Sequence, residues 1–505
     1  MLLGFVIAYW IISVGIGLYA ATRVHNTRDF AIAGRGLPFY MVTATVFATW
    51  FGSETVLGIP SIFLKEGLHG VVADPFGASM CLILVGLFFA APLYRMNLLT
   101  IGDFYKKKFG RSVEVLTTIA IVISYLGWVG AQITALGLVF NVVSNGEISK
   151  LAGMWIGSGT ILVYTFFGGM WAVAITDFLQ MIIIVIGMLF IGHEISGQVG
   201  GVSVVVAHAA QAGKFNFWPA PDAREIIAFA AAWVTMMFGS IPQQDVFQRV
   251  QSSKTESIAI WGAVFGGCLY FVFAFVPMFL AYSATLIDPK MVGGLINTDP
   301  QMILPTLVMQ HAPMFAQVMF FGALLSAIKS CASATLLAPS VTFSENILKP
   351  MLAHKLSDRR MLHLMRGVTV AFTVIVTLYA MNSKAGIFKM VENAYQITLV
   401  MAFIPLLAGI FWKRSTKQGA LAAIFCGLSV WLAILVFGPD EPFIPAQFAG
   451  LFASAFGMIA GSLLPGVAGG NLPEEPQHAQ LHHLAASHAG HVAEPQHHHS
   501  SHTQT

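Results

Sequence analysis

Long apolar stretches recur along the whole chain and constrain its fold more than any other feature of the sequence. About thirteen of them are long enough, at roughly 20 residues, for an α-helix to cross the hydrocarbon core of a bilayer. Hydrophobic residues make up 56% of the chain and charged residues 10%, which is too little charge to cover the surface of a water-soluble protein. We therefore predict an all-α integral membrane protein. The expected spans are residues 2–22, 38–63, 69–96, 114–145, 150–168, 170–195, 224–247, 256–284, 307–345, 364–382, 386–412, 416–437 and 443–465.

The loops and the C-terminal end indicate how the chain is organised across the membrane. Lys and Arg concentrate in alternate loops, for example at residues 106–108 and 413–417. Because basic loops face the cytoplasm, we expect the N-terminus outside and the C-terminus inside the cytoplasmic membrane. Residues 1–465 then form the membrane domain, and the His-rich residues 466–505 form a disordered cytoplasmic tail, which either collects metal ions or is merely solvated. The four cysteines have no spacing typical of a zinc site.

One segment, residues 313–342, carries a single charged residue, Lys329, near its middle. A lysine at the centre of an apolar span is costly, so it should face the protein interior. The surrounding small polar residues either allow close helix packing or offer oxygen atoms to an ion. They are Ser326, Ser330, Cys331, Ser333 and Thr335.

Two spans contain residues that disfavour a continuous helix. In the second span, Gly52, Ser53, Gly58 and Pro60 surround the charged Glu54. The seventh span carries Gly-Ser-Ile-Pro at 239–242, and the two breaks lie five spans apart. Interrupted membrane helices occur where the freed backbone lines a cavity, and this spacing fits an inverted repeat of five helices. The alternative for the second span is a kinked helix in which Glu54 has a structural partner.

Two further spans contain acidic residues. Asp177 follows Gly168-Gly169 by about two helical turns. Lys389 and Glu392 are three residues apart and share one helix face, so they form either a local ion pair or part of a site.

Together these motifs resemble the sodium/solute symporter family over residues 1 to 465. The segment 29–38 is similar to the first cytoplasmic loop of that family, and 168–180 is similar to its Gly-Gly-x-x-Ala-Val-x-x-Thr-Asp-x-x-Gln signature. Residues 48–50, 239–250 and 301–305 look closest to the choline-transporter branch. The resemblance implies a LeuT-type fold with a five-plus-five inverted-repeat core, whose repeats cover about 38–195 and 224–412.

The resemblance also implies an ion site between the first core helix and the eighth. Cys331 stands where the family usually has a hydroxyl, and a thiol is a poor ligand for sodium. Lys329 adds a positive charge, so we expect it to replace or rival the coupling ion and to pair with Asp177, with Glu54 or Glu392 as a less favoured partner. The expected ion-binding residues are Ala48, Phe51, Asp177, Ala327, Ser330, Cys331 and Ser333.

The substrate cavity is expected to lie between the two broken helices. Tryptophan faces attract ammonium groups, and Trp50 and Trp128 stand where the choline branch places aromatic residues. Gln243 and Glu392 replace further aromatic residues of that branch, so we expect an incomplete aromatic cage. The expected substrate-binding residues are Trp50, Ser53, Glu54, Thr55, Asp74, Trp128, Gln243, Gln244 and Glu392.

These features predict a secondary active transporter that moves a small polar or cationic organic solute together with sodium or a proton. Its partners are the solute, the coupling cation and the lipid bilayer, with no nucleic acid and no cofactor other than a sodium ion. The sequence has no phosphate-binding Gly-x-x-x-x-Gly-Lys-Ser/Thr motif, so a primary pump is not expected. The transporter prediction also means that no enzymatic activity is expected. The alternatives are a sensor that keeps the transporter fold and a passive channel.

Overall fold

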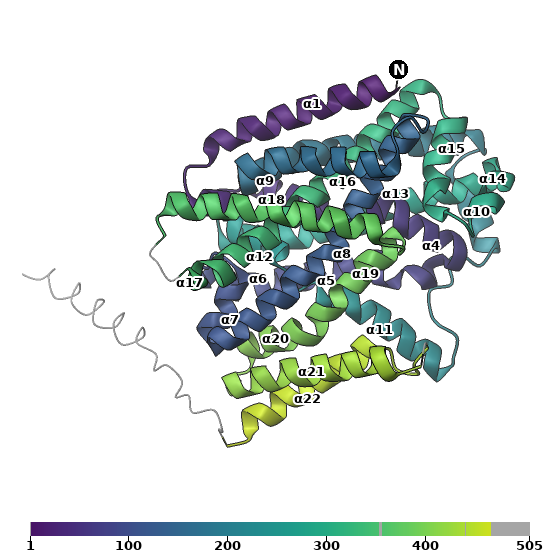
Figure 1. Cartoon of the computed structure of the whole chain (residues 1–505). Helices are drawn as coiled ribbons and strands as arrows, with labels where there is room; N and C mark the ends of the chain where they lie inside the picture. Colours follow the sequence, from purple (N-terminus) through teal and green to yellow (C-terminus); the bar gives the residue numbers. More distant parts are fainter. Residues whose placement is uncertain (1, 353–355, 440, 466–505) are drawn as a thin grey trace, which may run out of the picture. The chain divides into compact units, whose positions relative to one another are not determined.

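The computed structural model describes residues 2–352, 356–439 and 441–465, which are almost entirely helical (Figure 1). Up to Leu464 they belong to one compact unit. The predicted His-rich tail at 466–505 lies outside the described residues.

The helices vary widely in length, and five short π-helical segments lie between them. The π-helical segments are Glu54–Gly58, Val72–Gly77, Val85–Phe89, Ser344–Leu348 and Leu399–Phe403. The α-helices are α1 Leu2–Ala20, α2 Thr27–Ile32, α3 Phe39–Trp50, α4 Ile59–Glu66, α5 Ala78–Leu84, α6 Ala90–Met96, α7 Ile101–Phe109, α8 Arg111–Val143, α9 Lys150–Gln198, α10 Val202–Gln211, α11 Ala223–Gly239, α12 Gln244–Ser252, α13 Glu256–Ile287, α14 Pro289–Leu295, α15 Ile303–His311, α16 Met314–Phe343, α17 Lys349–Met351, α18 Asp358–Asn382, α19 Ile387–Thr398, α20 Ile404–Phe411, α21 Lys417–Phe437 and α22 Ala446–Leu463.

Among the described residues, 10 helices are long and apolar enough to cross a membrane, or 11 if α11 and α12 count as one bent span. The predicted number of about thirteen is therefore not confirmed. The 49-residue α9 contains two of the predicted spans, and they meet at Gly169, whose φ of 47° and ψ of −140° are not helical. The continuous run Glu54–Met96 also joins two predicted spans, and Asp74 within it is non-helical.

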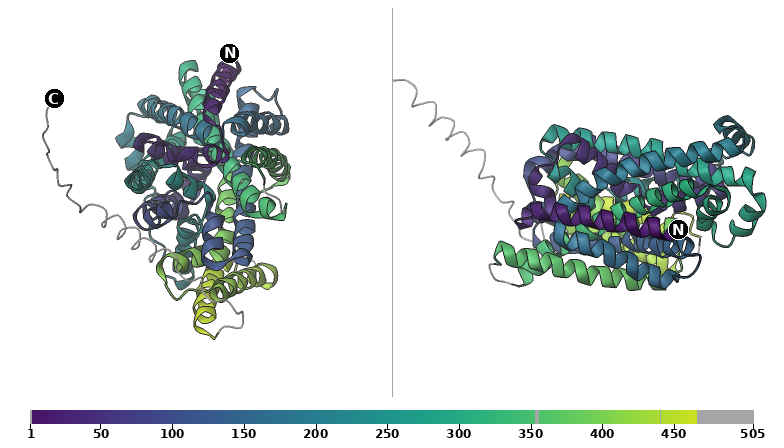
Figure 2. Two further views of the ribbon diagram at one scale, coloured as in Figure 1. Left: turned by 90° about the vertical axis from the view of Figure 1, so that its left-hand side faces the viewer. Right: turned by 90° about the horizontal axis from the view of Figure 1, so that it is seen from above.

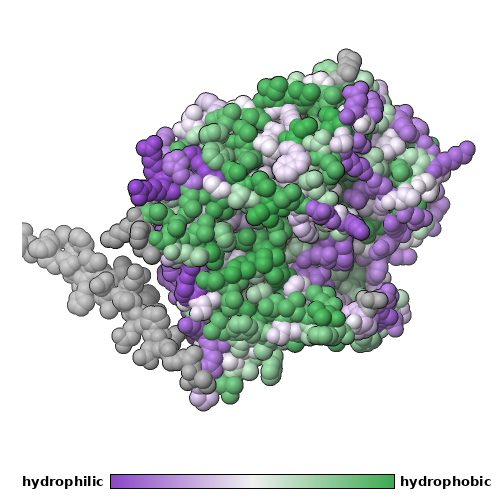
Figure 3. Space-filling model, in the orientation of Figure 1, coloured by the Kyte–Doolittle hydropathy of each residue, from purple (hydrophilic) through white to green (hydrophobic). Residues whose placement is uncertain are grey.

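The surface has the polarity expected of a membrane protein. In Figure 3, hydrophobic residues cover the middle of the visible face, and hydrophilic residues gather toward the two ends of the long helices. Large apolar side chains such as Ile11, Val272 and Phe456 are more than half exposed. An apolar band of this kind faces lipid rather than water.

Helix α16 lies at the centre of the bundle and packs against α3, α8, α9 and α18 (Figures 1 and 2). From Phe320 to Thr342 every residue of α16 is buried except Gly322. Small side chains along this helix let its neighbours approach closely. Lys329 on this helix is buried, so its predicted position in the protein interior is confirmed.

Both expected helix breaks are present. Helix α3 ends at Trp50, and Phe51 leaves the helix with φ −81° and ψ 76°. A Cβ atom on Gly52 would lie 2.8 Å from the Cys331 sulfur atom, so a glycine is needed where the break meets α16. The second break separates α11 from α12, which are bent by 45°. There, a Cβ atom on Gly239 would lie 2.5 Å from the carbonyl oxygen of Tyr395.

The two interrupted helices are joined by backbone hydrogen bonds at one end of the bundle. The amide of Leu37 donates to the carbonyl of Ser252 at 3.0 Å, and the amide of Lys254 donates to the carbonyl of Leu37 at 2.9 Å. These two hydrogen bonds form an isolated parallel β-bridge between Leu37 and Ser253. It ties the chain just before α3 to the chain at the end of α12.

Candidate functional site

A cluster of buried aromatic rings lies beside the first helix break. The ring centroid of Trp50, at the end of α3, is 5.4 Å from that of Trp128 on α8 and 6.2 Å from that of Tyr395 on α19. Tyr270 on α13 lies 6.5 Å from Trp50 on another side. Each of these rings is at most 2% exposed. We call Trp50, Trp128, Tyr270 and Tyr395 the aromatic cluster.

Two buried carboxylates border the aromatic cluster. Glu54 accepts hydrogen bonds from the Gln132 amide at 2.7 Å and from the Trp128 indole at 3.4 Å. Asp74 accepts a hydrogen bond from the Tyr270 hydroxyl. Among the described residues, neither carboxylate forms a salt bridge with a basic side chain. Buried carboxylates are normally paired with a cation, so these two could neutralise a positively charged ligand.

One hydroxyl group at the aromatic cluster also lacks a protein partner. The Tyr395 hydroxyl is buried and has no hydrogen-bond partner among the described residues, whereas the side chain of Ser53 lies beside the Glu54 carboxylate. In contrast, Thr55 is engaged with the Tyr270 hydroxyl at 3.1 Å and with the Trp50 carbonyl at 3.2 Å. An unsatisfied buried hydroxyl is costly, and a bound solute with a polar group would satisfy it.

Three other expected substrate residues are engaged with protein partners. The Gln243 amide donates to Ser124 at 2.9 Å, and Gln244 accepts from the amide of Ile101 at 2.8 Å, so both are engaged in joining α12 to other helices. Glu392 forms an ion pair of 2.7 Å with Lys389 and lines a separate cavity of about 660 Å³ together with His69. The local ion pair that the sequence left open is thus the arrangement found.

The break after α3 frees backbone oxygen atoms. In a continuous helix the Gly52 and Ser53 amides would bond the carbonyls of Ala48 and Thr49. Instead, the Gly52 amide donates to the Trp50 carbonyl at 3.0 Å, and the Ser53 amide donates to the Gln132 side chain at 2.9 Å. Free carbonyls at an interrupted helix suit a hard cation, which fits the expected ion-binding role of Ala48.

Asp177 joins three helices near these carbonyls. Its carboxylate accepts a hydrogen bond of 2.6 Å from Ser330 on α16 and another from Thr45 on α3. Arg249 on α12 interacts with Asp177 electrostatically and donates to Thr49 at 2.8 Å. A buried carboxylate with two hydroxyl groups offers oxygen ligands of the kind that hard cations such as sodium prefer.

The remaining expected ion-binding residues are all buried between α3 and α16. Phe51, Ala327 and Cys331 are 0% exposed. Ser333 donates to the carbonyl of Ser330 at 3.0 Å rather than to Asp177. Their position fits the expected site, while their role in binding an ion stays a prediction.

Of the expected pairing between Lys329 and Asp177, direct or through water, the direct ion pair is wrong. The Lys329 ammonium is buried and has no hydrogen-bond partner among the described residues. It lies 5.5 Å from the ring centroid of Tyr9, 5.9 Å from that of Trp10 and 5.7 Å from that of Tyr164. Lys329 therefore points toward α1 and α9, away from the helix face that carries Ser330. Cation–π contacts with aromatic rings, instead of an ion pair with a carboxylate, stabilise its ammonium group.

Replacing Lys329 by Met should stabilise the protein and leave its sodium dependence unchanged. Removing a buried ammonium group that lacks a carboxylate partner removes a desolvation cost, and apolar replacement of buried charges commonly stabilises by about 1–4 kcal/mol. Thermal unfolding in detergent and uptake under separate sodium and proton gradients measure the two effects. Lost sodium dependence, or proton-driven uptake in the wild type, would instead support a role for Lys329 in place of the ion.

Sequence reasoning missed several residues that complete the site. Tyr270 and Tyr395 lie within apolar runs, where an aromatic residue looks like ordinary core. Gln132 and Thr45 are each one of several polar residues in mainly apolar helices, so nothing in the sequence sets them apart. Arg249 had a detectable signal, because it follows the second break in a segment rich in amides.

The chain is similar in sequence to known transporters. Residues 30–427 match the sodium:solute symporter family. The human high affinity choline transporter 1 is 26% identical over 453 residues, covering 84% of this chain and 75% of the transporter. The high-affinity proline transporter PutP of Bacillus subtilis is also 26% identical, covering 89% of this chain and 95% of PutP.

The fold is similar to that of a Na⁺-coupled sialic acid symporter solved in a substrate-bound outward-open state. The two structures have a TM-score of 0.78 at 19% sequence identity, covering 92% of this chain and 98% of the other. This similarity confirms the predicted fold class of an all-α integral membrane protein. The family match covers most of the chain, including both interrupted helices and α16, and the chain therefore belongs to the sodium:solute symporter family.

Proposed function

We propose that this member of the family couples sodium entry to the uptake of a small organic cation, such as an ammonium compound. The observation that carries the proposal is the pair of buried carboxylates, Glu54 and Asp74, beside the aromatic cluster. An ammonium group would receive charge neutralisation from the carboxylates and cation–π attraction from Trp50 and Trp128. The similarity to choline transporters, whose substrate is an ammonium cation, favours the same class.

We propose sodium rather than a proton as the coupling ion. Supporting this choice are the freed carbonyl of Ala48, the carboxylate of Asp177 and the hydroxyl of Ser330, which lie where α3 meets α16. Oxygen atoms of these kinds suit a hard cation. We further propose that the N-terminus lies outside, because the basic loops then face the cytoplasm.

Uptake by purified protein in liposomes tests this function. A radiolabelled ammonium solute should accumulate inside when a sodium gradient is imposed, and accumulation should stop when the gradient is removed. A bound solute also raises thermal stability, by about 2.7 kcal/mol at a hundred times its dissociation constant. Screening ammonium compounds, amino acids and sugars for stabilisation in sodium would identify the class. Stabilisation by sugars alone would contradict the proposal.

Replacing Trp50 by Ala should weaken solute binding about thirtyfold, because a desolvated cation–π contact contributes about 2 kcal/mol. The measurement is the solute dependence of uptake, with thermal stability recorded in parallel. Trp155, which is 42% exposed on the apolar surface, provides a matched control. If Trp50→Ala loses stability and affinity equally, Trp50 has only a packing role.

A further inference from the structure

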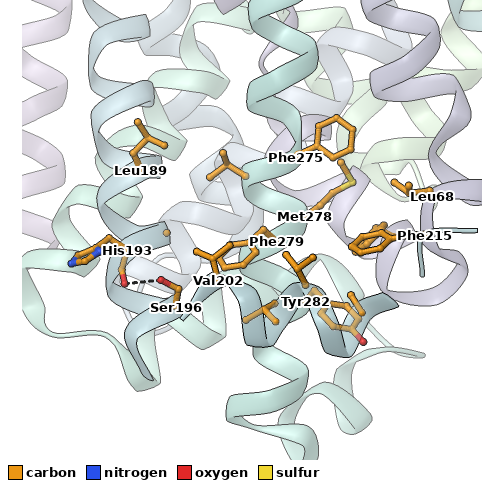
Figure 4. A pocket seen from close by; sticks show the side chains of 16 residues that line it. Leu68, Leu189, His193, Ser196, Val202, Phe215, Phe275, Met278, Phe279 and Tyr282 are labelled. Atoms are coloured by element: carbon orange, nitrogen blue, oxygen red, sulfur yellow. Dashed lines mark hydrogen bonds between the residues drawn. The ribbon is translucent and has the colours of Figure 1, made fainter. Parts of the chain in front are cut away.

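A mainly apolar cavity of about 520 Å³ has none of the aromatic cluster among its lining residues. It is formed by the ends of α9 and α13, the short helix α10 and parts of the chain around α4 (Figure 4). Apart from His193, Ser196 and Tyr282, its lining residues have no polar side chain. A volume of this size is typical of sites for small organic ligands.

The cavity is continuous with the surface that faces lipid. Leu189 on α9 and Val202 on α10 line it and are each about half exposed. On α13, Val272 is exposed to lipid one turn before Phe275 and Val276, which line the cavity. Leu189 lies nine residues before the end of α9, which corresponds to about 14 Å along the helix and places it within the hydrocarbon depth.

The polar groups of the cavity lie at one end of it. Figure 4 shows Leu189 and Phe275 at one end, and His193, Ser196 and Tyr282 toward the other. Along both α9 and α13 the polar residues come later in the chain than the apolar ones, so the two helices run toward the same membrane surface. Near that surface His208 of α10 contacts the Tyr282 hydroxyl at 2.9 Å. This polarity matches an amphiphile whose tail points inward and whose polar end lies at the interface.

From this geometry we infer that the cavity is a binding site for one acyl chain of a bilayer phospholipid. The tail lies between α9, α10 and α13, and the head group lies beside His193 and Ser196. Water is a poor occupant, because an apolar cavity offers it too few hydrogen-bonding groups. The inner wall includes Phe63 of α4, which follows the first helix break, so the bound chain contacts an element of the transport site.

The test uses phosphatidylcholine that carries a photoreactive diazirine in its acyl chain, in nanodiscs that contain the full-length protein. After illumination, mass spectrometry should find labels on peptides of α10 and of α13 around Phe275. Val206 lines the cavity and is 42% exposed, so Val206→Trp should fill it without disturbing the core. We expect labelling to fall about tenfold, which corresponds to about 1.4 kcal/mol of binding free energy.

Matched controls make the outcome decisive. Val204 is also on α10 and is 45% exposed, but it does not line the cavity, so Val204→Trp should label like the wild type. A second apolar cavity, lined by Phe452 and without polar residues, serves as an internal standard. None of the variants should change the photolabelling of peptides around that cavity. Val202→Trp should repeat the Val206→Trp result. Equal labelling in all variants, or no labelling of α10 and α13 in the wild type, would overturn the inference, and neither result depends on which solute is transported.

Discussion

Replacing Glu54 by Gln is expected to lower uptake of an organic cation by at least about thirtyfold. Glutamine has the same shape as glutamate and can still bond Gln132, but it removes the negative charge. Loss of one partner from a buried, hydrogen-bonded charge pair costs about 2–5 kcal/mol, and every 1.4 kcal/mol changes affinity about tenfold. The measurement is initial uptake over a range of solute concentrations, together with stabilisation of the purified variant by the solute.

Glu392→Gln is the matched control for that experiment. Glu392 is also a glutamate within a membrane helix, but it pairs with Lys389 in a different cavity. We expect its uptake to stay within about threefold of the wild type, as for a partly exposed ion pair worth less than about 1 kcal/mol. Full activity of Glu54→Gln would show that the solute is not recognised by its charge at this carboxylate.

Replacing Asp177 by Asn should raise the sodium concentration for half-maximal uptake by at least about tenfold. The carboxylate accepts from both Ser330 and Thr45. An amide has one oxygen atom, so one hydroxyl loses its acceptor and the attraction for a cation is lost. Buried charge-assisted interactions of this kind contribute about 1.5–3 kcal/mol each. Uptake should be measured at fixed solute across a range of sodium concentrations.

A change in Ser333 distinguishes ion binding from general loosening of α16. Ser333 lies one turn from Ser330 and bonds a backbone carbonyl instead of Asp177. Ser333→Ala should therefore change the apparent sodium affinity by less than about threefold, the effect of one neutral hydrogen bond. If Asp177→Asn lowered the maximal rate without changing the sodium dependence, Asp177 would be a structural residue that holds α3, α9 and α16 together.

The fold class and the two helix breaks could be predicted because they depend on local composition. Long apolar runs specify membrane helices, and Gly52 and Gly239 mark places where another chain segment approaches too closely for a side chain. The number of spans was harder to predict. Gly169 lies inside a continuous apolar stretch, so the sequence does not show whether the chain bends or ends there.

The site was predictable where a residue type is unusual in a membrane, and less so elsewhere. Glu54 and Asp177 stand out because a carboxylate inside a membrane span is energetically costly and therefore rare unless it has a function. The partner of Lys329 was not predictable, since helical spacing shows which residues share a face but not which neighbouring helix that face meets. Tyr395 was missed for another reason: its stacking on Trp50 joins residues that are far apart in the sequence.

The backbone bridge at Leu37 bears on how many states the transport cycle visits. Leu37 uses both its amide and its carbonyl to hold the chain at the end of α12. The start of one interrupted helix cannot shift relative to the end of the other without breaking both hydrogen bonds. Because the bridge makes the two interrupted helices move together, it favours one concerted change of access. It disfavours a sequence in which each half of the transporter opens separately.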